Sequence, residues 1–261
     1  MKLNKIYNID CINGMKLIGD KSVDMILCDL PYGTTKNKWD SIIPLDKLWE
    51  QYNRIIKDNG TIVLFAQTPF DKVLGNSNLK MLKYEWIWEK TTATGHLNAK
   101  KMPMKAHENI LVFYKKLPTY NPQKTKGHKR KVSKAIHKVN CVKTTDYGEY
   151  GLTTYDSTER YPRSVLQFPT DKQKCALHPT QKPIALLEYL IKTYSGEGDT
   201  ILDNCIGSGS TAVTCINTNR NFIGMDNGIC ETKNDNYGKA WAEIANSRLE
   251  NTYRELNCTS C

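Results

Sequence analysis

Short hydrophobic runs alternate with amphipathic segments along most of the chain. Runs rich in β-branched and aromatic residues, bounded by turn-forming residues, are typical of strands. The run Val23–Cys28 is apolar apart from Asp24, as expected of a strand that is covered on both faces. Seven such runs predict strands: Lys5–Asp10, Val23–Asp29, Thr61–Ala66, Tyr84–Glu89, Asn109–Tyr114, Thr200–Cys205 and Asn221–Met225.

Helical periodicity lies between these runs. In the segment Leu45–Lys57 the residues Leu48 and Tyr52 share one face, and Asn59-Gly60 supplies a stop. Further helices are predicted at Pro183–Tyr194, at Thr211–Asn217 and from about Lys233 to Glu255. Strands that alternate with helices favour an α/β fold with a mostly parallel sheet.

The segment from Lys115 to Phe168 interrupts this alternation. Its helical and strand periodicity is poor, and it is rich in proline and glycine. Segments of this length inside a compact domain are usually functional or disordered. We therefore predict an insertion outside the sheet at 115–168, between the two halves of one domain at 1–114 and 169–261.

The basic charge of the chain is concentrated in this insertion. The sequence has 37 Lys and Arg against 27 Asp and Glu, a net charge of +10. Ten basic residues and no acid lie between Lys115 and Lys143, so the rest of the chain carries 27 charges of each sign. This distribution favours a polyanionic partner, with a solvated basic loop as the alternative. The candidate phosphate contacts are Lys124, Lys126, Lys129, Arg130, Lys131 and Lys134.

Composition narrows the class of protein further. With 261 residues, 39% hydrophobic and 25% charged, the chain can bury a sizeable core and is not mostly disordered. Its longest apolar runs are too short to cross a membrane, and its first residues lack the apolar core of a signal peptide. Nine irregularly spaced cysteines are typical of a reducing cytoplasm. We therefore expect a cytoplasmic protein without a membrane partner.

Two arrangements of Cys and His resemble zinc-ligand spacing only loosely. The pair in Cys258–Cys261 has no second pair beside it. His137 and Cys141 would have to combine with Cys175 and His178, which are separated from them by more than thirty residues. We therefore predict no metal site.

A glycine-rich turn after a predicted strand is the strongest sign of a cofactor site. The strand ends at Asp203, Gly207 and Gly209 permit a tight turn beside a ligand, and a helix follows at once. Asp226 lies 19 residues beyond Gly207, at the end of the next strand, where a Rossmann-like site binds ribose hydroxyls. No Lys follows the glycines, and position 212 is Ala instead of a third glycine. A cofactor with ribose but no pyrophosphate fits best, which favours S-adenosylmethionine over NAD.

A second polar cluster follows the strand Val23–Cys28. The sequence Asp29-Leu-Pro-Tyr-Gly33 places a carboxylate, a rigid proline and an aromatic ring where open α/β sheets bind ligands. In isolation this sequence is equally typical of a capped turn. The companion cofactor motif favours a functional interpretation.

Together these motifs resemble the S-adenosylmethionine-dependent DNA amino-methyltransferases, in the group whose catalytic motif precedes its cofactor motif. Asp29-Leu-Pro-Tyr32 resembles the catalytic motif, and the block from His178-Pro-Thr-Gln-Lys-Pro183 to Thr211 resembles the cofactor-binding part. Asn8–Gly14 resembles the opening strand and turn. The resemblance covers nearly the whole chain except about Lys115 to Thr158, where the family has its target-recognition region. It implies a Rossmann-like, doubly wound, mostly parallel seven-stranded sheet with an inserted target-recognition region.

The resemblance also implies a role for each matching residue. The catalytic residues would be Asp29, Leu30, Pro31 and Tyr32, and the cofactor-binding residues Asp10, Lys182, Asp203, Cys205, Gly207, Gly209 and Asp226. Three positions depart from the commonest residue of the family. Leu30 replaces a proline, Cys205 replaces a phenylalanine and Asp226 replaces a glutamate.

The implied reaction is methylation of an exocyclic amine in double-stranded DNA. The Asp29 carboxylate and the Leu30 carbonyl would accept the two amino hydrogens, and Tyr32 would stack on a base flipped from the duplex. Cytosine C5 methylation is disfavoured because no Pro-Cys occurs in the sequence. Adenine N6 is favoured over cytosine N4 because an acid at position 29 resembles the adenine enzymes.

Two other classes of function stay open at this point. The same enzyme chemistry could act on RNA or on a free small molecule, in which case binding should depend little on salt. A catalytically silent nucleic-acid-binding protein could retain the same fold. Because members of this family often form homodimers, the resemblance also raises a homodimer as an assembly to test.

Overall fold

The structure is a computed structural model that describes residues 1–33, 40–133, 154–170, 181–231 and 235–259. The chain divides into two compact units, one made of Met1–Asn121 and Ser164–Cys261 and the other of Pro122–Arg163. The second unit spans fewer residues than the insertion expected at 115–168. None of the helices in the described ranges is long and apolar enough to cross a membrane.

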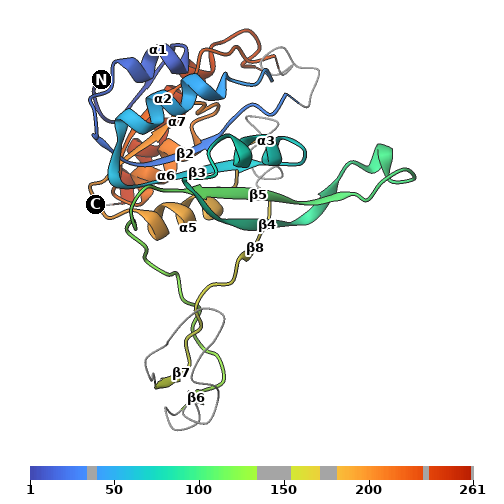
Figure 1. Ribbon diagram of the computed structural model, residues 1–261. Coiled ribbons are helices and arrows are strands. Elements are labelled where there is room, and N and C mark those ends of the chain that lie inside the picture. The colour runs from blue at the N-terminus through green and yellow to red at the C-terminus, as the bar shows by residue number, and fades with distance from the viewer. Residues whose placement is uncertain (34–39, 134–153, 171–180, 232–234, 260–261) are drawn as a thin grey trace. The chain divides into compact units, whose positions relative to one another are not determined.

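A mostly parallel sheet runs through the larger unit (Figure 1). Its strand order among the described residues is β1-β10-β9-β2-β3-β5-β4-β8, and only β5 runs antiparallel to its neighbours. The predicted α/β fold with a mostly parallel sheet is thus confirmed. The strands are β1 (Lys5–Tyr7), β2 (Val23–Asp29), β3 (Ile56–Ala66), β4 (Leu82–Thr94), β5 (Lys105–Phe113), β8 (Val165–Phe168), β9 (Thr200–Asp203) and β10 (Asn221–Met225).

The sheet has an eighth strand that the sequence analysis placed in the insertion. Strand β8 pairs in parallel with β4, with Leu166 opposite Trp88, and the Trp88 indole N–H donates to the Phe168 carbonyl at 2.9 Å. The prediction that 115–168 lies wholly outside the sheet is therefore wrong at its end. The run was overlooked because β8 is a short edge strand in which only Leu166 is buried, so it lacks a clear hydrophobic pattern.

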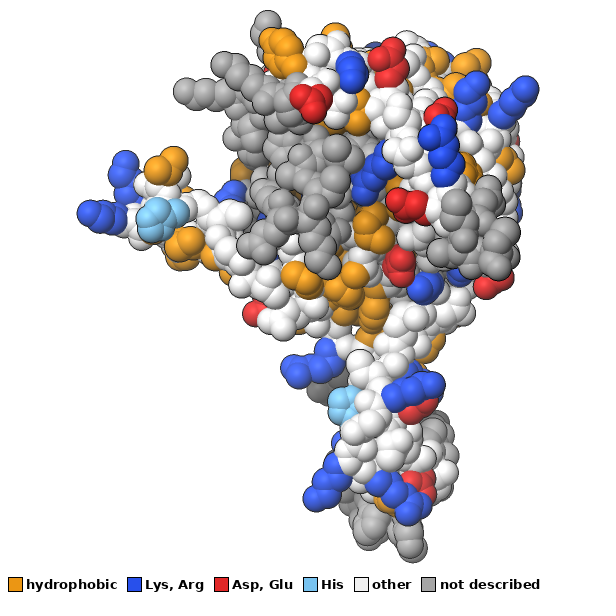
Figure 2. All heavy atoms as spheres, turned by 180° about the vertical axis from the view of Figure 1, so that it is seen from behind, with side chains coloured by type: hydrophobic (Ala, Val, Ile, Leu, Met, Phe, Trp, Pro, Cys, Tyr) orange, Lys and Arg blue, Asp and Glu red, His pale blue; other side chains and the backbone are white. Residues whose placement is uncertain are grey.

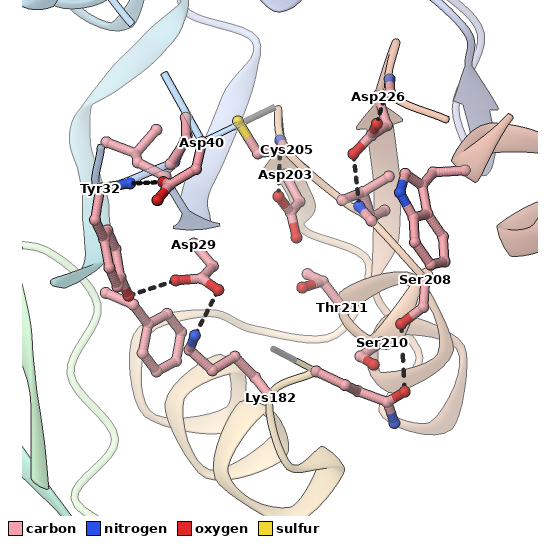
Figure 3. A pocket seen from close by; sticks show the side chains of 18 of the residues that line it. Asp29, Tyr32, Asp40, Lys182, Asp203, Cys205, Ser208, Ser210, Thr211 and Asp226 are labelled. Carbon is pink, nitrogen blue, oxygen red and sulfur yellow. Dashed lines mark hydrogen bonds and ion pairs between the residues drawn. The ribbon is translucent and has the colours of Figure 1, made fainter. Parts of the chain in front are cut away.

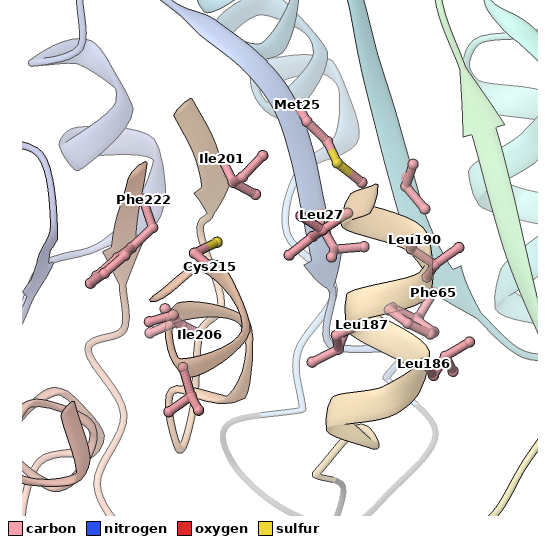
Figure 4. Close-up of a cluster of buried hydrophobic side chains, with 14 of the residues drawn as sticks. Met25, Leu27, Phe65, Leu186, Leu187, Leu190, Ile201, Ile206, Cys215 and Phe222 are labelled. Atoms are coloured by element: carbon pink, nitrogen blue, oxygen red, sulfur yellow. The ribbon is translucent and has the colours of Figure 1, made fainter. Parts of the chain in front are cut away.

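Helices cover both faces of the sheet, which makes the fold doubly wound. Along β2, Met25 and Leu27 point into one hydrophobic cluster, whereas Ile26 and Cys28 point into the other. This alternation explains why β2 is apolar throughout. The helices on the first cluster are α5 (Ile184–Tyr194), α6 (Ser210–Asn217) and α7 (Trp241–Thr259), and those on the second are α1 (Cys11–Lys16), α2 (Leu45–Ile55) and α3 (Phe70–Ser77). Figure 4 shows Leu187 and Leu190 of α5 packed over the β2 and β3 side chains.

Two helix boundaries differ from the prediction. Helix α2 ends at Ile55, and Asn59-Gly60 lies within an irregular part of β3 instead of stopping the helix. Helix α7 begins at Trp241 and not near Lys233, because residues 235–238 form turns and Ala240 bridges to Ile229. The left-handed Gly238, with φ of 80°, prevents a regular helix there.

The remaining elements are short. A 3-10 turn, η1 (His96–Asn98), lies between β4 and β5. In the smaller unit, β6 (Lys131–Ser133) pairs antiparallel with β7 (Tyr155–Ser157), and Thr125 bridges to Arg160.

Candidate active site

A cavity of about 980 Å³ lies at the carboxyl ends of β2, β9 and β10. The catalytic motif after β2 and the glycine-rich turn after β9 line the same cavity (Figure 3). Open α/β sheets bind ligands at this edge. Of the predicted catalytic and cofactor-binding residues, the cavity is lined by Asp10, Asp29, Leu30, Pro31, Tyr32, Lys182, Asp203, Cys205, Gly207 and Asp226.

Asp29 ends β2 and is held by its own turn. The Tyr32 hydroxyl donates to Asp29 Oδ1 at 2.6 Å, so the aromatic ring and the carboxylate form one unit. The backbone N–H groups of Tyr32 and Gly33 both donate to Asp40 Oδ1 at 2.8 Å, which fixes the turn. The Tyr32 ring stacks on Phe70 with 5.5 Å between the ring centroids. The Tyr32 ring, which the sequence analysis expects to stack on a flipped base, is therefore already held in one orientation.

Lys182 lies against the carboxylate of Asp29, although the sequence analysis assigned it to the cofactor. Its Nζ atom is 2.5 Å from Asp29 Oδ2 and 3.4 Å from Glu108 Oε2. Lys90 Nζ is in turn 2.5 Å from Glu108 Oε1. Lys90 and Glu108 line the cavity but were missed by the sequence analysis. The available signal was an acid directly before the buried run Asn109–Phe113 of β5.

Burial dominates the electrostatics of this end of the cavity. Burial raises the pKa of Asp29, whereas the neighbouring Lys182 ammonium lowers it and Glu108 raises it. The pKa of Tyr32 is also raised, by burial and then by the charge of Asp29. Tyr32 therefore stays a neutral phenol that donates its hydrogen bond.

The other end of the cavity contains the acids expected for a cofactor. Gly207, with φ of 50°, donates its backbone N–H to Asp226 Oδ2 at 2.9 Å, and Gly228 donates to Asp226 Oδ1 at 2.8 Å. Asp10 caps α1 by accepting the Asn13 N–H at 3.0 Å. Each carboxylate oxygen has a second lone pair, so these acids can still accept hydrogen bonds from a ligand.

Gly209 does not line the cavity. Its φ is 82°, and a Cβ atom there would lie 3.0 Å from the Cβ of Ala245 in α7. The close approach of a ligand to this glycine stays a prediction. A side chain is excluded by the backbone conformation and by packing against α7.

Asp203 is a buried acid at the end of β9. Only 5% of the residue is exposed, and its Oδ1 accepts the Cys205 N–H at 3.1 Å. Burial raises the pKa of Asp203 to about 7, which hydrogen bonds from Thr211 and Cys205 only partly oppose. A carboxylate in this state favours a cationic ligand group, because a nearby positive charge would stabilise its ionised form.

Two thiols line the cavity beside these acids. Cys11 and Cys205 are half-buried, free and hydrogen-bonded to each other. That bond lowers the pKa of Cys11. Cys205, the departure from the family phenylalanine, thus contributes a small polarizable group to the cavity wall.

The basic segment is partly neutralised within the smaller unit. Arg130 Nη2 lies 2.6 Å from Asp156 Oδ2, and Lys124 Nζ lies 3.4 Å from Glu159 Oε2. Lys and Arg side chains lie on the surface of this unit (Figure 2). Within the described ranges, the candidate lysines that are exposed without a recorded ion pair are Lys126, Lys129 and Lys131. Lys134 lies outside the described residues.

The loose Cys and His arrangements fall on residues that the structure does not describe. His137, Cys141, Cys175 and His178 lie outside the described residues, as do the side chains of Cys258–Cys261. In the parts of the chain that the structure describes, no group of three or more His, Cys, Asp or Glu side chains could hold a metal ion.

Comparisons with known proteins agree with this geometry. A family model described as DNA methylase matches residues 23–234. The type II methyltransferase M.HpaI of Haemophilus parainfluenzae is 27% identical over 94% of this chain and 73% of its own length. The DNA adenine methyltransferase YhdJ of Escherichia coli strain K12 is 28% identical over 85% of this chain and 77% of its own length.

Solved structures share the fold. The complex of M1.HpyAVI with SAM has a TM-score of 0.62 at 22% identity, covering 94% of this chain and 98% of that one. The cytosine-N4-specific PvuII DNA methyltransferase has a TM-score of 0.60 at 15% identity, covering 94% of this chain and 92% of that one. Since the family model spans most of the sequence, including both motifs of the cavity, the chain belongs to the DNA methylase family.

Proposed function

We propose that this protein transfers a methyl group from S-adenosylmethionine to the exocyclic N6 amine of adenine in a specific sequence of double-stranded DNA. The observation that carries the proposal is the single cavity that brings Asp29 and Tyr32 together with Asp203 and Asp226. An amine acceptor and a cofactor must meet in one space for direct transfer, and this cavity provides it.

The residues at the cofactor end fit S-adenosylmethionine. The buried Asp203 favours a positively charged group, which the amino acid part of this cofactor carries. Asp226 and Asp10 are acceptors for the hydroxyl and amino hydrogens of an adenosine, and Ser210 and Thr211 supply hydroxyls. When bound, the cofactor supplies an electrophilic methyl group on a positively charged sulfur.

Asp29 and Leu30 prepare the amine. Its lone pair is delocalised into the base ring, so the nitrogen is a poor nucleophile until its hydrogens are held by acceptors. The Asp29 carboxylate and the Leu30 carbonyl would accept these hydrogens and direct the lone pair toward the methyl group. Asp29 would also accept the proton that the nitrogen releases once it carries the methyl group. Positioning and electrostatics supply most of the rate.

Tyr32 and the basic segment would bind the DNA. A base inside a duplex cannot reach this cavity, so it must be flipped out of the stack. Stacking on one aromatic side chain contributes about 1–3 kcal/mol. Lys126, Lys129 and Lys131 are the candidates for contacts with phosphates.

The alternatives differ in their support. Cytosine N4 is the second candidate base, because the PvuII enzyme with a similar fold is named as specific for it. Adenine is favoured by the acid at position 29 and by the adenine methyltransferase YhdJ among the relatives. A catalytically silent binding protein has no evident use for an intact Asp29 and Tyr32. We also infer a cytoplasmic location, which the free thiols of Cys11 and Cys205 support. We further infer a homodimer, because members of this family often form one.

The test is incubation of the purified protein with duplex DNA and S-adenosylmethionine labelled in its methyl group. Enzymatic digestion and chromatography of the nucleosides identify the labelled base. The proposal predicts N6-methyladenine with the wild type and none with Asp29→Ala. Transfer to RNA in place of DNA, or no transfer with cofactor bound, would reject it.

A further inference from the structure

A chain of four alternating charges runs along the wall of the cavity. Lys90 on β4 contacts Glu108 on β5 at 2.5 Å, and the same glutamate lies 3.4 Å from Lys182. Lys182, just before α5, contacts Asp29 at the end of β2 at 2.5 Å. Four separate segments of the chain thus meet through charged side chains.

The chain is largely shielded from water. The side chains of Lys90 and Glu108 are 11% exposed and that of Lys182 is 8% exposed, while Asp29 is 24% exposed. Removing charged groups from water is costly, and replacing a buried ion pair by apolar side chains of similar volume often leaves the stability of a protein unchanged or increases it. Buried ionic groups at a ligand cavity are therefore better explained by function.

Lys182 is held from several sides. A lysine ammonium is a point charge on a flexible stem, so it needs fixed partners to stay in one place. Its Nζ atom lies 5.0 Å from the centroid of the Phe65 ring and 5.9 Å from that of Tyr32, in addition to its two acids. Glu108 is the only one of these partners that is itself anchored by a second cation among the described residues.

The ammonium has a direct consequence for the reacting carboxylate. Asp29 must be ionised if both of its oxygens are to serve as hydrogen-bond acceptors for the amine. Burial of the side chain favours its protonated form instead. The titratable groups that act on it are, besides Lys182 and Glu108, the side chains of Tyr32, Cys28 and Asp203. Lys182 is the cation among them.

We propose that Lys182 is a positioning residue that keeps Asp29 ionised and oriented for the amine, and that Glu108, anchored by Lys90, shares the Lys182 ammonium with Asp29 and so limits this effect. This inference rests on the proposed function. It predicts that the two neighbours of Asp29 act in opposite directions: loss of the Lys182 charge raises the pKa of Asp29, and loss of the Glu108 charge lowers it.

The kinetic test is the single-turnover rate of methyl transfer as a function of pH, with cofactor and DNA saturating. Lys182→Met should lose on the order of tenfold in rate at pH 6 and recover most of it at pH 9, since one pKa unit is a factor of ten in protonation. Glu108→Gln, which keeps the shape of the side chain, should move the acid limb of the profile to lower pH. Lys57→Met is the matched control, because it also removes a lysine that is paired with an aspartate of β2. That aspartate, Asp24, lies at the other end of β2 from Asp29. Its profile should match the wild type.

A second measurement is independent of activity. The carboxyl ¹³C resonance of Asp29, assigned with Asp29→Asn, reports its titration in each folded variant. Opposite shifts in Lys182→Met and Glu108→Gln support the proposal. Unchanged titration in both variants, or an equal loss of rate at every pH with no shift, would overturn it. If the wild type transfers no methyl group but the resonance shifts as expected, the proposed function fails and the electrostatic role of Lys182 stands.

Discussion

Replacing Asp203 by asparagine should make the protein more stable above neutral pH and weaken its hold on the cofactor. The substitution keeps the size of the side chain and an oxygen that can accept the Cys205 N–H. It removes the charge and replaces the second acceptor oxygen by an NH2 donor, which disturbs the hydrogen bond from Thr211 equally at every pH. Asp203 is 5% exposed, and burial raises its pKa from the ordinary 3.8 to about 7.

The magnitude follows from the linkage between protonation and folding. The folded state binds the Asp203 proton more tightly than the unfolded chain, so this group costs stability progressively as pH rises from about 4 to about 7. Above pH 7 the full cost is present. At roughly 1.4 kcal/mol for each pKa unit, it is on the order of 4 kcal/mol as an upper bound.

Urea unfolding of the wild type and of Asp203→Asn between pH 5 and pH 8 measures this difference. All other titrating groups are shared by the two proteins, so the difference in unfolding free energy isolates Asp203. We expect the variant to gain stability over the wild type as pH rises, and to bind S-adenosylmethionine more weakly in calorimetry. A difference that is constant across this pH range, or that shrinks as pH rises, would refute the reasoning.

Three further predictions concern the DNA contacts, the thiols and the aromatic ring. The lysines without a recorded ion pair in the described part of the smaller unit are Lys126, Lys129 and Lys131. Changing all three to glutamine should reduce the slope of log affinity against log salt by roughly 3, at about 0.9 per phosphate contact, with cofactor affinity unchanged. Alkylation by N-ethylmaleimide, followed by mass spectrometry, should modify Cys11, whose pKa is lowered, and saturating S-adenosylmethionine should protect it; Cys205, whose pKa is raised, and the buried Cys215 should not react in either case. Tyr32→Phe should retain DNA affinity in fluorescence titrations, whereas Tyr32→Ala should lose on the order of tenfold, and equal losses in both would contradict stacking.

Sequence patterns predict the elements whose environment is uniform along their length. Strand β2 is buried on both faces, so its apolar run is visible without any tertiary knowledge. Strand β8 buries only Leu166 and is held by pairing with β4, and no local pattern reports such pairing. Helix α5 was predicted because it follows a proline and has a full apolar stripe. The start of α7 was not, because turns precede Trp241.

The site was predictable where a motif carries its chemistry within a few residues. Asp29 and Tyr32 are three positions apart, and their hydrogen bond forms within one turn. Lys182 and Asp29 are 153 positions apart, so their contact depends on the order of strands in the sheet. Glu108 gains its partners only when β4 and β5 pair, and Gly209 gains its constraint only when α7 packs on it.

The central claim is methyl transfer to an exocyclic amine of adenine in DNA with Asp29 as acceptor. Its most direct test is sequencing of modified bases in the genome of a host that lacks adenine methylation, after expression of the wild type or of Asp29→Ala. The account predicts N6-methyladenine at one recurring sequence with the wild type and unmodified adenine with the variant. Absence of a modified base with a stable wild-type protein, or the same methylation with Asp29→Ala, would contradict it.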